Sequence, residues 1–484
     1  MEVKSDKIKF VKILSYILAV VALLIVSFFA FLYRIDANPL FIWDEARVAV
    51  SALEMSQSHN YFIPTYEGAP DMWSVKPPLM IILQSVSMKL FGYSELGARM
   101  PTVLAAFATI YFLFWFAVKI LKNFIAAFCA VLFLCTSTGY VCAHVARAGD
   151  YDTLLIFFLT AYFIFAITYL FTKKYRFYIL FNVFLLFALL TKGIAGIFFL
   201  PGIFLLFVSE KNFFKEYFNV RTLLPPLIVF TCFVSYYLIR EVYNPGYIHT
   251  VVFEEMQGRM FDSRFDTNSK WYSFFESMTV SDFNPWCIFV PLSILVYGIS
   301  TQIEKRLIVG IWLTLIVFWI PLTISINKNS WYIAPSFPLL SLLSAFTFSK
   351  ICLLVTREIK SKSISIAIVS VIIILISIFP VMKIIDNSYE LNERFGFAEL
   401  VKSKRIQSGT KIISEGYNSP IVFYQKALKL RGVNVKVTSM HNIKEGDTVI
   451  AISANEVNEV KQHFQCDVLY ACKETEMLFL KPKA

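Results

Sequence analysis

Long apolar runs separated by short polar loops fill most of this 484-residue chain. About eleven of these runs hold roughly 15 to 24 residues with hardly a charge, each about long enough to cross a hydrocarbon core of about 30 Å. The pattern predicts an all-α, polytopic membrane protein. The expected spans lie at about 10–33, 100–118, 124–142, 152–171, 177–191, 194–209, 222–241, 285–302, 307–325, 333–349 and 363–384.

A shorter apolar run at 79–91 does not fit this series, because a crossing there would move every later loop to the other side of the membrane. We expect a helix lying at the outer interface instead. From about residue 385 the pattern changes to short alternating runs, which predict strands, separated by short helical patterns. The chain is therefore expected to divide into a transmembrane domain, 1–384, and a small soluble α/β domain, 385–484.

Composition agrees with this division. Only 16% of the residues are charged and 57% are hydrophobic, whereas a soluble domain carries about 25% charged residues. The 45 Lys and Arg outnumber the 34 Asp and Glu, but the basic residues gather in alternate, mostly short loops. This bias predicts a cytoplasmic N-terminus and an extracytoplasmic C-terminus, and it explains the positive charge without nucleic acid.

The eight cysteines show no metal-type spacing. Two of them, Cys466 and Cys472, lie in the hydrophilic tail, where an oxidising compartment could join them. The alternative is a pair of ordinary strand cysteines.

The expected outer segments, 34–99, 143–151, 242–284 and 326–332, hold the candidate chemistry. Asp44 opens a helical pattern that ends near Ser58, and it is either a functional acid or a simple helix cap. Lys76 precedes two prolines and is expected in an extended conformation. Its ammonium suits a phosphate at headgroup depth, or it is a snorkelling interfacial lysine.

Two further outer loops carry charges directly beside apolar spans. Asp150 and Asp152, with Arg147 nearby, precede one span, although they could be an ordinary helix cap. Lys328 and Tyr332 precede another, where aromatic and basic residues are common. Acids and lysines gathered on one membrane face favour a functional site, because a transporter would place charges near mid-span.

These motifs, in this order, resemble those of the GT-C membrane glycosyltransferases. The branches that are most similar are the lipid A aminoarabinose transferases and, more distantly, the protein O-mannosyltransferases. The resemblance covers about residues 30–345. The motifs that carry it are Trp43-Asp44-Glu45-Ala46-Arg47, Lys76-Pro77-Pro78-Leu79, Phe91-Gly92 with Arg99-Met100-Pro101, Arg147 with Asp150 and Asp152, and Lys328, Tyr332 and Pro335.

The resemblance implies inverting transfer of a sugar from a polyprenyl-phosphate donor to a lipid (lipid A-like), glycan or protein acceptor. Asp44 would be the first catalytic acid and Asp152 the second, with Asp150 as its neighbour. Glu45, Arg47 and Arg147 would support them. The implied residues for the donor phosphate are Lys76, Lys328, Tyr332 and Arg259.

One position departs from the pattern. Val75 stands where the aminoarabinose branch carries an acidic residue implicated in metal binding, so a divalent metal and the lipid A acceptor are both left open. Two other functions also stay open: a transporter or flippase for lipid-linked sugars, and a non-catalytic membrane assembly factor. The expected location is the cytoplasmic (inner) membrane of a bacterium.

Overall fold

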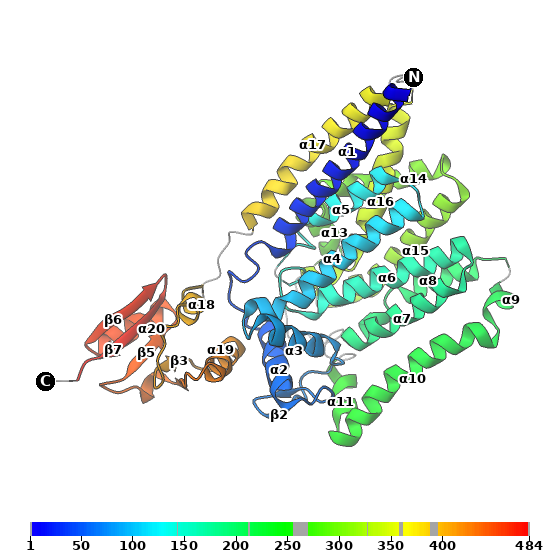
Figure 1. Cartoon of the computed structure of the whole chain (residues 1–484). Coiled ribbons are helices and arrows are strands. Elements are labelled where there is room, and N and C mark those ends of the chain that lie inside the picture. Colours follow the sequence, from blue (N-terminus) through cyan, green and yellow to red (C-terminus); the bar gives the residue numbers. More distant parts are fainter. Residues whose placement is uncertain are drawn as a thin grey trace.

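A computed structural model describes residues 2–142, 144–211, 213–254, 270–326, 328–357, 362–387 and 395–482. Helices lie side by side in a bundle, and a small sheet domain sits beyond one end of it (Figure 1). The N-terminus lies at the opposite end. The short helices α2 (Asp44–Ser58), α3 (Leu79–Phe91) and α11 (Tyr247–Val252) share the end of the bundle where the sheet domain lies.

Seven helical stretches within the described residues are long and apolar enough to cross a membrane. The chain is therefore an integral membrane protein, as predicted. These stretches are formed by α1 (Glu2–Ser27) with η1 (Phe28–Leu32), α4 (Glu95–Lys119), α6 (Tyr151–Thr172), α7 (Tyr175–Lys192) with η2 (Gly193–Ile197), α10 (Val220–Tyr243), α15 (Gln302–Ile324) and α16 (Ser336–Val355).

The other four predicted spans also fall on helices, three of which are short, so the count of eleven crossings is not confirmed. They are α5 (Phe124–Cys135), α8 (Leu200–Val208), η5 (Trp286–Ile288) with α14 (Phe289–Gly298), and α17 (Lys362–Asn387). Four further short elements of the described helical part are α9 (Phe213–Tyr217), α13 (Ser273–Ser277), η4 (Met278–Asp282) and η6 (Ser330–Ile333).

Helix α6 lies at the centre of the bundle and is buried on nearly every side. This burial explains its sequence, which is apolar around the whole helix rather than along one stripe. Close helix approaches use small residues: Gly202 in α8 packs against the backbone of Thr314 in α15, where a Cβ would collide. The apolar helix α3 packs between α2 and α4 at the end of the bundle.

The tail forms the predicted α/β domain. Its five strands are β3 (Lys411–Ile413), β4 (Lys436–Thr438), β5 (Thr448–Ala451), β6 (Cys466–Cys472) and β7 (Thr475–Leu480), in the order β4-β3-β5-β7-β6. Strand β3 is parallel to β4 and β5, whereas β7 is antiparallel to both neighbours. Its helices are α18 (Phe395–Lys402), α19 (Ser419–Leu430), η7 (Met440–Asn442) and α20 (Ala454–His463). Cys466 and Cys472 are free thiols at opposite ends of β6.

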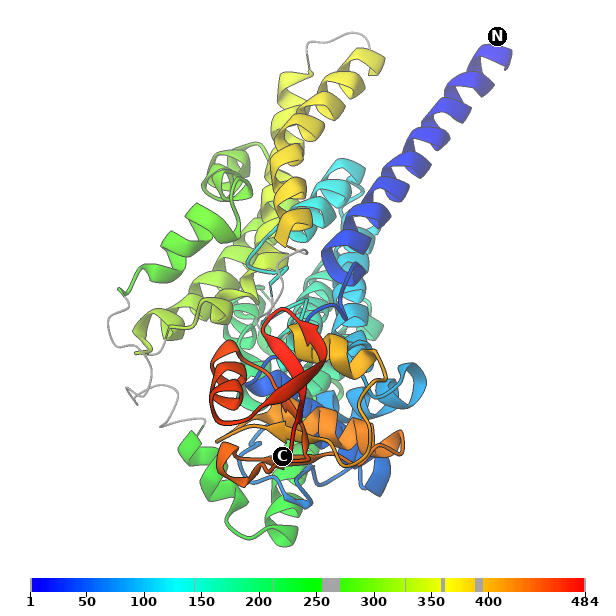
Figure 2. The same ribbon diagram turned by 90° about the vertical axis from the view of Figure 1, so that its left-hand side faces the viewer.

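Helix α19 fixes this domain against the helical part, next to α2 (Figures 1 and 2). The Tyr424 hydroxyl donates to Glu95 Oε1 over 2.7 Å, and the Leu40 amide donates to Tyr424 over 3.3 Å. Lys426 forms an ion pair of 2.9 Å with Glu54. These contacts place the loop before α19 beside the first residues of α2.

Candidate active site

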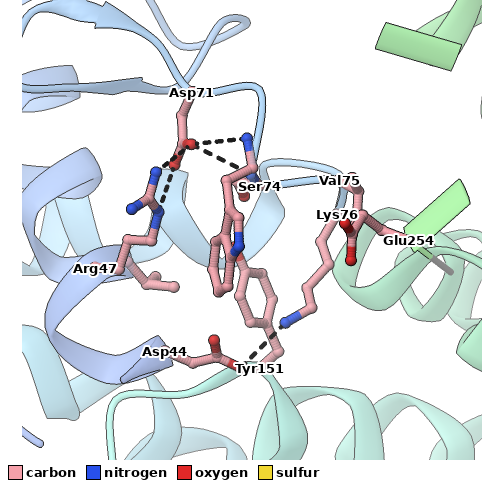
Figure 3. Close-up of a pocket in the computed structure, with 10 residues that line it drawn as sticks. Asp44, Arg47, Asp71, Ser74, Val75, Lys76, Tyr151 and Glu254 are labelled. Carbon is pink, nitrogen blue, oxygen red and sulfur yellow. Dashed lines mark hydrogen bonds and ion pairs between the residues drawn. The ribbon is translucent and has the colours of Figure 1, made fainter. Parts of the chain in front are cut away.

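Asp44 and Lys76 face each other, although 32 residues separate them (Figure 3). Asp44 is the first residue of α2, as the sequence predicts, where the helix dipole favours a negative charge. Its side chain is 36% exposed, and Oδ2 lies 3.4 Å from the Lys76 ammonium. A carboxylate open to solvent beside a cation can orient or deprotonate a hydroxyl group.

Lys76 is almost completely buried, with a side chain only 7% exposed. It lies in a bend before Pro77, and helix α3 begins directly after the second proline. Its ammonium lies 4.5 Å from the centre of the Tyr151 ring, a cation–π contact that replaces part of the lost hydration. Lys76 is therefore a desolvated positive charge, which attracts an anion more strongly than an exposed lysine does.

Asp150 and Asp152 have different surroundings. Asp150 caps α6, because its Oδ1 accepts a 2.6 Å hydrogen bond from the Tyr151 amide. Burial, together with the negative charges of Asp44 and Asp152, raises the pKa of Asp150 to about 7. Asp152 is buried as well, and Lys192 lies 2.5 Å from it.

Glu45 connects the first and second outer segments. Its carboxylate accepts bonds of 2.6 and 2.9 Å from Arg99 and a 2.6 Å bond from the Gly149 amide. Arg99 is fully buried, and it also donates to the carbonyl groups of Ile35, Asn38 and Pro39. The network fixes the start of α2 against the loop that carries Asp150, so Glu45 positions the site rather than facing it.

Arg47 and Arg147 also bind within the protein. Arg47 donates to both carboxylate oxygens of Asp71, over 2.7 and 3.3 Å, and lines the same pocket as Asp44. Arg147 donates to the carbonyl groups of Ala30 and Tyr33, and thus supports the end of the first span rather than the nearby acids.

The segment with Lys328 and Tyr332 lies beside the second outer loop, because Trp331 stacks on His144 with ring centres 4.0 Å apart. The Lys328 ammonium donates to the Ser325 carbonyl over 2.6 Å. Arg259, the remaining predicted residue, lies outside the described residues.

Two cavities share Lys76 among their lining residues. One is a polar pocket, lined also by Asp44, Arg47, Asp71, Trp73, Ser74, Tyr151 and Glu254 (Figure 3). The other is an apolar groove between the end of α7 and helices α10 and α11, lined also by Ile194, Phe233, Val234, Tyr237, Leu238 and Ile248. Lys76 lines both cavities, and Lys192 joins it at the groove.

In the ranges that the structure describes, no three His, Cys, Asp or Glu side chains gather as a metal site would require. Val75, which stands where the aminoarabinose transferases carry an acidic residue, is buried and apolar. The carboxylates of Asp44 and Asp152 each lie beside a lysine.

Lys192 is a site residue that the motifs do not indicate, because from the sequence alone Lys192 and Gly193 are expected to form a short outer turn between two spans. The sequence does offer one indication, because Lys192 is a lone charge at the end of an apolar run. Burying such a charge costs free energy unless an opposite charge pairs with it. Asp71 gave no such signal because it lies in an irregular loop.

The chain is similar in sequence to known proteins. A family model described as dolichyl-phosphate-mannose-protein mannosyltransferase matches residues 75–236. An uncharacterised protein of Aquifex aeolicus is 28% identical over 68% of this chain and 73% of its own length.

Two solved structures share the fold. ArnT from Cupriavidus metallidurans, bound to undecaprenyl phosphate, is similar over 96% of this chain and 97% of its own, with a TM-score of 0.65 and 15% identity. The archaeal oligosaccharyltransferase AglB from Archaeoglobus fulgidus, in complex with an inhibitory peptide and a dolichol-phosphate, is similar over 86% of this chain and 64% of its own, with a TM-score of 0.52 and 11% identity. The predicted resemblance to the GT-C membrane glycosyltransferases is confirmed.

Proposed function

We propose that this chain, which has the fold of the GT-C membrane glycosyltransferases, transfers a sugar from a polyprenyl-phosphate donor to a lipid, glycan or protein acceptor. One observation carries the proposal: a single buried lysine, Lys76, lines both a polar pocket that holds Asp44 and an apolar groove. A lipid-linked sugar has the same two parts, an apolar chain and a polar sugar, joined by a phosphate.

The apolar groove suits the polyprenyl chain, and its charged end suits the phosphate. Lys76 and Lys192 both line the groove, so two lysines would supply positive charge for the donor phosphate. The solved structures of ArnT with undecaprenyl phosphate and AglB with dolichol-phosphate support a donor of this class.

The polar pocket suits the transfer step. The acceptor oxygen would bond to the anomeric carbon from the face opposite the phosphate, while the bond from that carbon to the phosphate oxygen breaks. Asp44 would orient the acceptor and take its proton late, because a carboxylate is a weak base for a hydroxyl group. Lys76 and Lys192 would stabilise the negative charge on the departing phosphate.

The other predicted residues have supporting roles in this proposal. Asp152 forms an ion pair with Lys192. Asp150 would change the net charge near Asp44 and Lys76 when it gains or loses a proton. Lys328 and Tyr332 are proposed to contact the donor from the segment that packs on the second outer loop. Arg259 stays a prediction from the sequence.

We place this site at the extracytoplasmic face of a bacterial inner membrane, with the N-terminus in the cytoplasm. The basic loops predict this orientation. The fold supports this orientation, because α2, α3, α11 and the C-terminal domain share one end of the bundle, opposite the N-terminus (Figure 1).

Mass spectrometry of envelope lipids, glycans and glycoproteins tests the proposal, in cells with the wild-type chain or with Asp44→Asn. We expect one glycosylated product to disappear and one polyprenyl-phosphate sugar to accumulate. Asp36→Asn is the matched control, since Asp36 is an exposed acid of the same outer segment. Membrane levels of all variants are compared by immunoblot.

Unchanged products in Asp44→Asn cells, with normal protein levels, would refute the catalytic assignment and favour an assembly factor. A flippase gives a third result: purified protein moves the lipid-linked sugar across vesicles without forming a new glycosidic bond.

A further inference from the structure

Three exposed aromatic side chains lie at or next to the polar pocket: Trp73 lines it, Trp43 precedes the lining residue Asp44, and Tyr417 interacts with the lining residue Arg47. Trp43 directly precedes Asp44 and is 65% exposed, Trp73 is 56% exposed, and Tyr417 is 46% exposed. The rings of Trp43 and Tyr417 are stacked, with centres 6.5 Å apart and planes 25° from parallel. Tyr417 comes from the C-terminal domain, in the loop between β3 and α19, so two domains form this surface.

Arg47 holds the surface together from beneath. Its guanidinium lies 4.7 Å from the centre of the Trp73 ring and 4.1 Å from that of Tyr66. It also interacts with the Tyr417 hydroxyl, while Asp71 fixes its orientation. The exposed rings are therefore positioned before any ligand arrives, which reduces the entropy lost on binding.

The loop with Tyr417 is anchored as well. Ser419, at the start of α19, is hydrogen-bonded to Tyr66 over 3.0 Å. Lys426, in the same helix, pairs with Glu54. Tyr417 thus stays beside Trp43 as long as the domain stays docked.

This surface has the chemistry of a saccharide site. A sugar ring has an apolar C–H face, which packs on an aromatic face, and a polar edge of hydroxyl groups. Arg47, Asp71 and Ser74 line the pocket next to the rings and offer polar partners for that edge. An extended peptide would instead pair with a sheet edge, and the nearby strands β1 (Thr65–Tyr66) and β2 (Ala69–Pro70) have only two residues each.

We infer that Trp43, Trp73 and Tyr417 bind a saccharide ring of the acceptor, so that the C-terminal domain completes the acceptor site. The inference deepens the proposed function and rests on it, since it takes the polar pocket as the place of transfer. It narrows the acceptor to a glycan or glycolipid.

Saturation-transfer NMR on the full-length protein in nanodiscs tests the inference with a panel of mono- to tetrasaccharides. Saturation of the protein's aromatic protons should pass to the sugar C–H protons. Trp43→Ala and Tyr417→Ala should each weaken saccharide binding by about 3- to 10-fold, the free energy of an aromatic contact. Binding of undecaprenyl phosphate should not change in either variant.

Trp271→Ala is the matched control, because Trp271 is equally exposed, at 68%, and lies outside this surface. Unchanged saccharide binding in Trp43→Ala and Tyr417→Ala overturns the inference, as does a wild-type protein that binds none of the panel. Quenching of Trp43 fluorescence by brominated lipids would also overturn it, since that result places the ring in the membrane interface.

The two proposals can fail separately. If Asp44→Asn abolishes transfer while Trp43→Ala and Tyr417→Ala bind saccharides normally, the proposed function stands and the acceptor surface is wrong. If Asp44→Asn transfers normally, the proposed function fails, whatever the NMR shows.

Discussion

The Lys192 ammonium lies 2.5 Å from Oδ1 of Asp152, and only 10% and 6% of the two side chains are exposed. Lys192 ends α7 and Asp152 lies in the first turn of α6, so the pair joins two helix ends at the apolar groove. Each charge has lost most of its hydration and depends on the other.

Removing one partner should destabilise the protein strongly. Lys192→Met leaves Asp152 buried without this cation, which costs about 3–5 kcal/mol in comparable pairs. We expect a lower apparent melting temperature in detergent, measured by tryptophan fluorescence. The double variant Lys192→Met with Asp152→Asn should recover part of the loss, and additive losses would contradict the pairing.

Lys76→Met should lower the rate of sugar transfer by about 100-fold, as removing one group that stabilises transition-state charge does elsewhere. It should also weaken binding of undecaprenyl phosphate, measured by native mass spectrometry. Lys89→Met is the control, because Lys89 lies on the next helix, at the surface, beside Tyr61. Equal effects of the two substitutions would exclude a specific role for Lys76.

The pKa of Asp150 predicts a pH dependence of stability. Its pKa rises from an ordinary value of 3.8 to about 7 on folding, chiefly because of burial. Between these values the folded chain holds a proton that the unfolded chain has lost, so stability falls as pH rises, and it levels off above about pH 7. Asp150→Asn removes this contribution.

Melting temperatures between about pH 5 and 8 check the sign. The wild type should lose stability relative to Asp150→Asn over the lower part of this range. Parallel curves for the two proteins would show that Asp150 is ionised throughout. Asp36→Asn, an exposed acid, should follow the wild type.

Glu45→Gln should impair folding and activity together. The substitution leaves Arg99, which is fully buried, beside a neutral amide, and it weakens the bond to Gly149 that positions the loop with Asp150. Loss of a buried ion-pair partner costs about 3–5 kcal/mol. The amount of folded protein in the membrane, measured by fluorescence size-exclusion chromatography, reports the effect. A normal yield with normal activity would contradict it.

Much of the architecture could be predicted because its signals are local. Asp44 begins a helix that ends at Ser58, as the pattern indicates, since the helix dipole favours acidic residues within the first turn. Alternating runs at 433–438, 448–452 and 477–480 predict strands, and strands β4, β5 and β7 lie on them, with β7 beginning two residues earlier. Strands β3 and β6 and helix α19 were missed. Strand β3 has only three residues, too few to show a period.

The pairings in the site could not be predicted in this way. Asp44 meets Lys76, and Asp152 meets Lys192, across 32 and 40 residues. Such contacts depend on how helices pack, which short motifs do not encode. Residues that are close in sequence can also have separate partners. Arg147 is two residues from Gly149, yet it binds the carbonyl groups at the end of the first span.

The position of Lys76 at the junction of two cavities has a kinetic consequence for the proposed transferase. The apolar groove and the polar pocket share Lys76 as a lining residue but are otherwise lined by different residues, apart from Val75. A donor that arrives through the groove does not block the path of an acceptor that arrives through the pocket. The substrates can then bind in either order, and the spent lipid phosphate can diffuse away sideways before or after the product departs.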